Sequence, residues 1–153
     1  MTIVRKLADG IGLGLMAGLA GTAAMTVSST LEARWRGRAA SSAPARATAK
    51  VLGIDAFESD LARARFNDLA HWGYGTGWGV VRGLLGAAGV SPRAATAAHG
   101  AAVYGAAQVT LPVLEIAPPA VFWSPEEIAV DALHHAVYAT ATGLAYEALR
   151  GRR

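Results

Sequence analysis

Four histidines lie among residues that are otherwise mostly apolar or small, and histidine changes its charge near neutral pH. Two of them have a carboxylate at helical spacing. Asp68 precedes His71 by three residues, and Asp131 precedes His135 by four. On a helix, each carboxylate can orient the imidazole beside it. Such pairs predict proton movement or pH sensing, and the plainer alternative is that these side chains only form hydrogen bonds between helices.

Two of the histidines open similar segments, "HWGYGTGWG" from residue 71 and "HAVYATATG" from residue 135. In both, a tyrosine follows the histidine by three residues, a small residue by four and a glycine by eight. Positions four and eight apart share one helix face, where small residues let a neighbouring backbone approach closely. The similarity predicts two pseudo-equivalent helices, with chance resemblance in an alanine-rich chain as the alternative. Neither segment is a phosphate-binding glycine loop, because the third glycine of that motif and a preceding strand are missing.

The composition indicates a membrane protein. Hydrophobic residues make up 53% of the 153 residues and charged residues only 16%, with 18 glycines. The net charge of +3 gives no continuous basic patch between aromatic residues, so a nucleic-acid partner is not predicted. The chain has no cysteine, which excludes disulfides and thiolate metal sites. It also lacks the serine-hydrolase, zinc-protease and nucleotide-binding motifs, so we predict neither an enzyme nor a metal site.

Four apolar segments are each long enough to cross a bilayer core of about 30 Å as a helix. They cover about residues 11–27, 69–90, 94–114 and 128–149. Capping residues place two helix starts, Ser91-Pro92 near residue 92 and Ser124-Pro125-Glu126-Glu127 near residue 125. The sequence therefore predicts a single all-α domain over 1–153, an integral membrane bundle of four transmembrane helices.

The segment 31–68 is too polar to cross a membrane and is predicted to be an extramembrane loop. Within it, Val51, Ile54, Phe57 and Leu61 recur at helical spacing opposite charged residues. This pattern is typical of an amphipathic helix lying on the membrane surface. A partly ordered loop is the alternative.

Two sets of residues are predicted to organise the bundle. Glycines that recur every four residues are expected to form close helix contacts. These packing glycines are Gly10, Gly14, Gly18, Gly75, Gly79 and Gly143. Ionisable and hydroxyl side chains within the spans are expected to face the bundle interior as a polar cluster. The cluster comprises His71, Tyr74, Arg82, His99, Asp131, His134, His135 and Tyr138.

The positions of the predicted turns give the depth of these groups. They place His71, Thr110 and Asp131 in one layer, and Arg82, His99 and Thr142 in a second layer. His71 and His135 are the pair best placed to ligate b-haem, but their depths differ by roughly 6 Å at about 1.5 Å per residue. We therefore expect no cofactor.

The basic residues give conflicting evidence on orientation. Arg5 and Lys6 before the first span, and Arg150, Arg152 and Arg153 after the last, predict that both termini face the cytoplasm. With both termini inside, the first loop would lie outside. Its seven basic residues between positions 34 and 65 instead favour the cytoplasmic side. We predict a multi-pass protein of the bacterial plasma membrane with both termini inside. Cleavage of the first apolar segment as a signal peptide is the alternative to a first span.

Several motifs resemble the YagU-like family of small bacterial inner-membrane proteins of unknown function. The glycine-rich span headed by His71 is followed by a small-residue span that ends in "TLPVLEIAPPAVFWSPEE". Asp131 and a histidine-bearing last span then lead to "YEALRGRR", and "GLMAGLAGT" near the start is a looser match. The resemblance covers mainly residues 69–150. It implies an integral membrane protein and brings no established activity.

The leading hypothesis is a small membrane protein whose His/Asp/Tyr cluster passes protons or a small solute, or senses pH. The alternative is a structural or accessory subunit that packs through its glycine-rich faces. The expected partners are the lipid bilayer and other membrane subunits or further copies of the chain.

Overall fold

The computed structural model describes residues 2–39 and 41–151, and in this part of the chain it contains helices and no strand. The prediction of an all-α protein is confirmed. The elements are α1 (Ile3–Arg36), α2 (Ala43–Leu52), α3 (Asp60–Ala87), α4 (Pro92–Val113), the short 3-10 helix η1 (Ala120–Phe122) and α5 (Pro125–Arg150).

The start of α5 is fixed by a capping box. The Ser124 hydroxyl accepts a hydrogen bond from the Glu127 N–H at 3.2 Å, and the Glu127 carboxylate accepts one from the Ser124 N–H at 2.7 Å. The bond from the Ser124 N–H holds the pKa of Glu127 below its ordinary value. The predicted starts at residues 92 and 125 are both confirmed, although the Ser91 side chain makes no cap bond.

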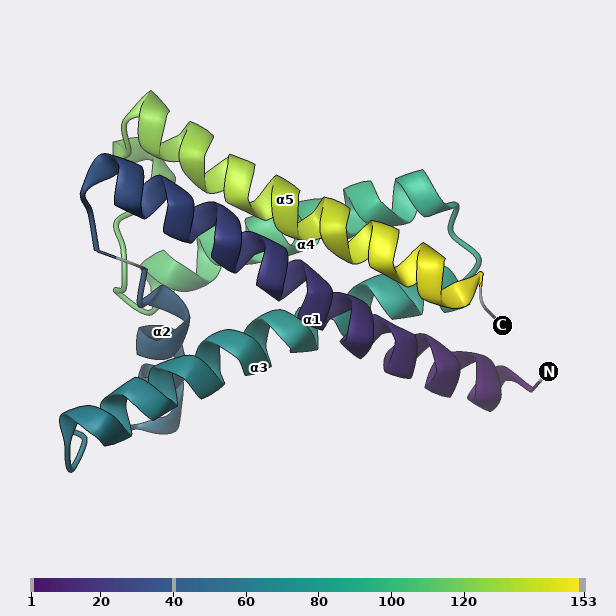
Figure 1. Cartoon of the computed structure of the whole chain (residues 1–153), viewed down its shortest axis with the longest axis horizontal. Coiled ribbons are helices and arrows are strands. Elements are labelled where there is room, and N and C mark those ends of the chain that lie inside the picture. The colour runs from purple at the N-terminus through teal and green to yellow at the C-terminus, as the bar shows by residue number, and fades with distance from the viewer. Residues whose placement is uncertain (1, 40, 152–153) are drawn as a thin grey trace.

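The long helix α1 lies between α3 and α5 and packs on both, and α4 packs on the other side of α5 (Figure 1). Helix α2 lies in the angle between α1 and the N-terminal half of α3 (Figure 1). The start of α1 and the end of α5 lie at the same end of the molecule (Figure 1). This arrangement puts one face of α1 against α3 and another against α5.

The predicted first loop is shorter than expected, and its helix lies elsewhere. Helix α1 continues to Arg36 and α3 begins at Asp60. The prediction of a surface helix through Ile54 and Phe57 is wrong, because α2 ends at Leu52. Gly53 adopts a left-handed φ of 66° there and its N–H bonds back to the last turn, which ends the helix.

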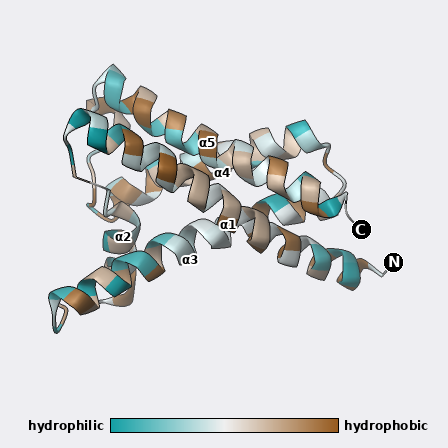
Figure 2. Ribbon diagram, in the orientation of Figure 1, coloured by the Kyte–Doolittle hydropathy of each residue, from teal (hydrophilic) through white to brown (hydrophobic). Residues whose placement is uncertain are grey.

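Large polar side chains are buried in the interior, while many aliphatic side chains are exposed. The largest fully buried side chains are Arg82, Tyr138, His99, Thr22 and Thr142, with no aliphatic residue among them. Aliphatic side chains such as Met16, Leu19 and Leu144 are instead 58%, 51% and 69% exposed. Figure 2 shows brown apolar bands along the middle of α1 and α5. Soluble proteins bury such residues first.

Helix α1 is the one helix of the described residues whose length and hydropathy suffice to cross a membrane. A buried helix of a soluble protein or a signal sequence would satisfy the same two criteria. The four predicted spans are thus supported directly at α1 only.

Candidate functional site

Helices α1 and α3 meet through glycine. A methyl group built on Gly14 would lie 2.5 Å from the Gly79 carbonyl oxygen, and one on Gly18 would lie 2.9 Å from the Gly79 Cα. One on Gly10 would lie 2.8 Å from the Gly83 oxygen. These distances are too short for a real Cβ, so the two backbones touch directly. The sequence pattern had not singled out Gly83.

The other two predicted packing glycines lie against threonines. Gly75 of α3 faces Thr22 of α1, and Gly143 of α5 faces Thr96 of α4. A Cβ on either glycine would be 3.2 Å from the threonine Cβ. All six glycines predicted to pack therefore lie at helix contacts.

Polar side chains form a buried stripe along α5. His134, Tyr138, Thr142 and Tyr146 recur every four residues and are at most 6% exposed. At about 1.5 Å per residue the stripe runs for about 18 Å. It carries His134 and Tyr138 of the predicted cluster and Thr142 of the predicted second layer, and it adds Tyr146, which the prediction did not include.

The two tyrosines of this stripe join α5 to α3. Tyr138 donates a hydrogen bond to the Gly75 carbonyl at 2.6 Å, and Tyr146 donates one to the Gly83 carbonyl at 3.4 Å. The tyrosines are eight residues apart, as are the glycines, so α3 and α5 run parallel in matched register. Both hydroxyls can reach a backbone carbonyl because glycine leaves it uncovered.

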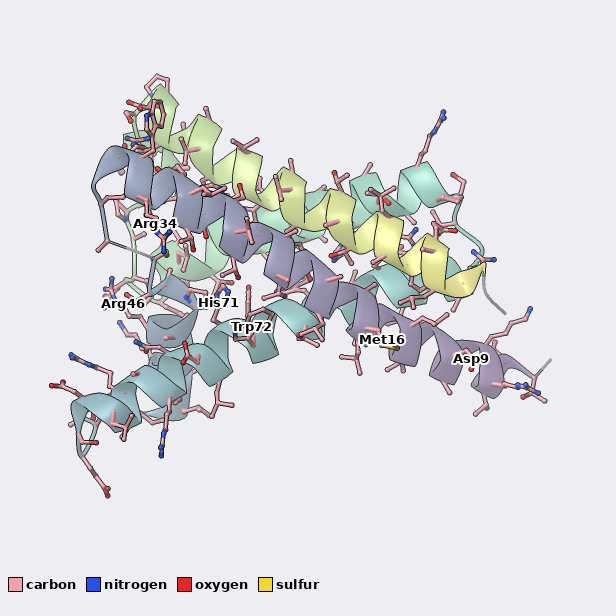
Figure 3. All side chains as sticks on the ribbon, viewed as in Figure 1. Asp9, Met16, Arg34, Arg46, His71 and Trp72 are labelled. Carbon is pink, nitrogen blue, oxygen red and sulfur yellow. The ribbon has the colours of Figure 1, made fainter. Side chains whose placement is uncertain are left out.

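Two histidines join further helix pairs. His71 Nε2 is hydrogen-bonded to the Thr26 hydroxyl of α1 at 2.8 Å, and Figure 3 shows His71 on the side of α3 that faces α1. His99 of α4 donates through Nε2 to the Trp78 carbonyl of α3 at 3.1 Å. Its ring also lies 5.5 Å from that of Tyr138.

Asp131 and His135 form a small group between α4 and α5. His135 Nδ1 lies 3.4 Å from an Asp131 carboxylate oxygen and donates to the Asp131 carbonyl at 2.8 Å. The Gln108 amide of α4 donates to the same carboxylate at 3.0 Å. The Tyr104 ring packs edge-on against the imidazole at 5.3 Å. The predicted Asp131/His135 pair is thus present.

Arg82 is wholly buried near the other end of the bundle. Its Nη2 donates to Glu147 of α5 at 2.6 Å, and its guanidinium lies over the Tyr146 ring at 4.5 Å. Its Nε and Nη1 find no hydrogen-bond acceptor in the part of the chain that the structure describes. Glu147 was not predicted as a site residue, because a charged residue close to the chain end is usually solvated.

Glu32 links the C-terminal end of α1 to the N-terminal end of α5. It is not among the predicted site residues. Its carboxylate is 12% exposed and pairs with Arg38, with Arg36 at 3.4 Å and with His134 Nε2 at 3.6 Å. Arg36 also reaches Glu126 of α5 at 3.1 Å. The hydrogen bonds from Arg38, helped by the neighbouring charges, hold the pKa of Glu32 below its ordinary value. We call Glu32, Arg36, Arg38 and His134 the Glu32 cluster.

His134 is also held by a hydroxyl of α1. Its Nδ1 is hydrogen-bonded to the Ser28 hydroxyl at 2.9 Å, and the imidazole is 6% exposed. Of the two adjacent histidines, His134 therefore faces α1 and His135 faces α4.

No family model, curated protein or solved structure compared with the chain matches it. The resemblance to the YagU-like family stays a prediction.

One residue of the predicted cluster does not lie in the interior. Tyr74 is 42% exposed and packs against Trp78 on the outside of α3, so it does not join the interior. His71 and His135, the pair considered for haem, have contacts on different helices, α1 and α4. His71 contacts Thr26 of α1, whereas Asp131 contacts Gln108 of α4 and His135.

No group of three or more histidine or acidic side chains is arranged to hold a metal ion within residues 2–39 and 41–151. The interior polar groups instead form hydrogen bonds and ion pairs, most of which link one helix to another.

The glycines of "HWGYGTGWG" lie on two different faces of α3. Gly75 and Gly79 pack against α1, whereas a methyl group added to Gly73 or Gly77 would have no neighbouring atom within 4 Å. Gly73 and Gly77 line a surface groove of about 400 Å³ together with Tyr74, Trp78 and Val81. We call these five residues the outer groove.

Proposed function

We propose that the protein is an integral membrane protein with four spans, which lie within α1, α3, α4 and α5. The observation that supports this is the exposed aliphatic surface around an interior of glycine and polar side chains. In lipid, close backbone packing and hydrogen bonds hold helices together, since apolar side chains gain nothing by leaving the hydrocarbon. Every polar contact of the interior described above fits that requirement.

We propose that both termini face the cytoplasm. The start of α1 and the end of α5 lie at the same end of the bundle (Figure 1). An even number of spans requires this, because each pair of spans returns the chain to the side from which it started. Arg5, Lys6 and Arg150 support the cytoplasmic side. Arg152 and Arg153, which entered the same prediction, lie outside the described residues.

Within this membrane protein, the function that the geometry supports best is that of an accessory subunit. The supporting observation is the outer groove, in which Gly73 and Gly77 form a small-xxx-small pair that no helix of this chain fills within the described residues. Such a pair lets a second transmembrane helix approach closely, and Tyr74 and Trp78 flank it with large side chains. The occupant that we propose is a transmembrane helix of another subunit.

A cysteine at the outer groove tests this role. The chain has no cysteine of its own, so Gly77→Cys introduces a single thiol. We expect this thiol, alkylated with a maleimide–benzophenone reagent and irradiated in native membranes, to cross-link the variant to one defined partner by insertion into a C–H bond, and mass spectrometry identifies the adduct. Gly12→Cys is the matched control, because Gly12 of α1 also has no neighbour within 4 Å but lies outside the groove. Equal cross-linking of both variants would overturn the proposal, and an adduct of two copies of the chain would identify a homo-oligomer instead.

A second candidate function is pH sensing at the Glu32 cluster. This cluster joins the C-terminal end of α1 to the N-terminal end of α5 through one carboxylate. Protonation of Glu32 would remove the negative charge that Arg36, Arg38 and His134 share. Passage of protons along α5 is less well supported, because Tyr138 and Tyr146 each commit the hydroxyl proton to a glycine carbonyl.

We expect Glu32→Gln to change how the protein responds to acid. The partners lower the pKa of Glu32, so its stabilising effect is complete above the ordinary value of 4.5 and is lost as the pH falls through the lowered folded-state value. The unfolding temperature of the wild type should therefore fall more steeply below pH 4.5 than that of Glu32→Gln. Scanning fluorimetry of the purified protein between neutral and acid pH measures this. Glu58→Gln, in the exposed loop, is the control, and parallel curves for wild type and Glu32→Gln would count against sensing at this cluster.

A further inference from the structure

A pocket of about 490 Å³ lies between α2 and the first turns of α3. Arg46 of α2 and Arg63 of α3 line it from two sides. Asp60 adds one carboxylate, so the lining keeps one excess positive charge, and Ser42 and Asn67 add a hydroxyl and an amide. Its volume is within the range of small-molecule sites. None of the residues that line the pocket belongs to the outer groove or the Glu32 cluster.

The charges in this pocket favour an anion. The Arg46 guanidinium has no ion pair among the described residues, so its charge is uncompensated. Arg63 is paired with Asp60 at 2.8 Å, but both side chains are largely exposed and such a pair is easily exchanged. The helix α2 also begins at this pocket. The Ala43 N–H is bonded to the Ser41 hydroxyl and Pro44 has no N–H, so the Ala45 N–H is the one that Ser42 leaves without a cap bond. Two guanidinium groups beside a helix N-terminus match the hydrogen-bonding needs of a phosphate.

The rest of the pocket is apolar. Ala45, Ala49, Ala64 and the half-buried Phe57 form part of its wall, and Phe57 is held by the Phe66 ring at 5.1 Å. A ligand that fills this space therefore carries an apolar part next to its anionic group.

The pocket lies where a membrane surface would meet the bundle. Figure 3 shows Arg46 of α2 at the same end of the molecule as Arg34, close to the end of α1. Val51 and Leu52 at the end of α2 are 70% and 62% exposed. A short helix that combines exposed apolar residues with basic ones is typical of the bilayer interface.

We infer that the pocket between α2 and α3 binds the phosphate group of an anionic glycerophospholipid, with Arg46 and Arg63 on the phosphate and Phe57 against the glycerol. The lipid source rests on the membrane location proposed above. The same phosphate chemistry could be supplied by free phosphate in solution, and the test separates the two.

The test uses the full-length protein purified in a neutral detergent. Its thermal unfolding is followed by tryptophan fluorescence while one of three probes is titrated: dihexanoyl phosphatidylglycerol, dihexanoyl phosphatidylcholine or inorganic phosphate. We expect saturable stabilisation by phosphatidylglycerol, with an apparent affinity about tenfold weaker in Arg46→Gln and weaker still when Arg63→Gln is added. Arg65→Gln is the matched control, because Arg65 lies on the same helix outside the pocket.

Each result decides the inference. Unchanged affinity in Arg46→Gln, or an equal response to phosphatidylcholine, overturns it. Inorganic phosphate that binds as tightly and with the same dependence on Arg46 overturns the lipid source. Sedimentation of the chain with carbonate-washed membranes checks the membrane location separately. Failure of cross-linking at Gly77 would not affect the result, because the outer groove shares no residue with this pocket.

Discussion

Gly79→Ala is expected to destabilise the protein by about 1–3 kcal/mol, the usual cost of overpacking a well-packed contact. The added methyl group would lie 2.6 Å from the Gly18 Cα and 2.7 Å from the Gly18 nitrogen. Both are backbone atoms, so no side chain can rotate away and α1 and α3 must separate. The measurement is the unfolding temperature in detergent, together with the yield of monodisperse protein in size-exclusion chromatography.

Gly77→Ala provides the matched control. Gly77 is two residues away on the same helix, and a Cβ there meets no atom within 4 Å. Both substitutions gain the same helix propensity, about 1 kcal/mol in favour of alanine, so the difference between them isolates the contact with α1. Equal unfolding temperatures for the two variants would contradict the α1–α3 packing.

Glu147→Gln is expected to cost up to about 3 kcal/mol, the lower end of the range for breaking a buried ion pair. The substitution leaves the wholly buried Arg82 without its carboxylate, and two nitrogens of Arg82 already lack partners. We place the effect at the lower end because the Glu147 side chain is 35% exposed. Chemical or thermal unfolding of the purified protein measures it.

A double substitution separates the ion pair from packing. Arg82→Met with Glu147→Gln removes both charges, and we expect it to be more stable than Glu147→Gln alone. Asp60→Asn, which breaks the exposed pair with Arg63, should change stability by less than about 1 kcal/mol. A double variant no more stable than Glu147→Gln would show that the carboxylate does not compensate Arg82.

Local signals in the sequence predicted the helices well. The capping box at Ser124 gave the start of α5, and the four-residue repeat of Gly10, Gly14 and Gly18 gave the face of α1 that packs. The position of α2 was missed because Ile54 and Phe57 fit a helical pattern by spacing alone. The single glycine at position 53, with its positive φ, overrides that pattern.

Partners on distant helices could not be predicted in the same way. Short turns fix the register of neighbouring helices, so the contact between Asp131 and Gln108 is within two residues of the Thr110 level that the turn predicts. No turn connects α1 to α5, and the contacts of Glu32 and His134 depend on how α1 is rotated. The pairing of Arg82 with Glu147 likewise links α3 to α5, which are not consecutive.

The place of α1 between α3 and α5 sets an order of assembly. Its glycine face can meet α3 as soon as the first half of the chain has been made, but Leu13, Ala17 and Gly21 on its other side wait for the last helix. Until α5 emerges from the ribosome, that side of the first helix lacks the residues that cover it in the folded chain. A chain truncated before α5 would thus leave this side of α1 uncovered along its length.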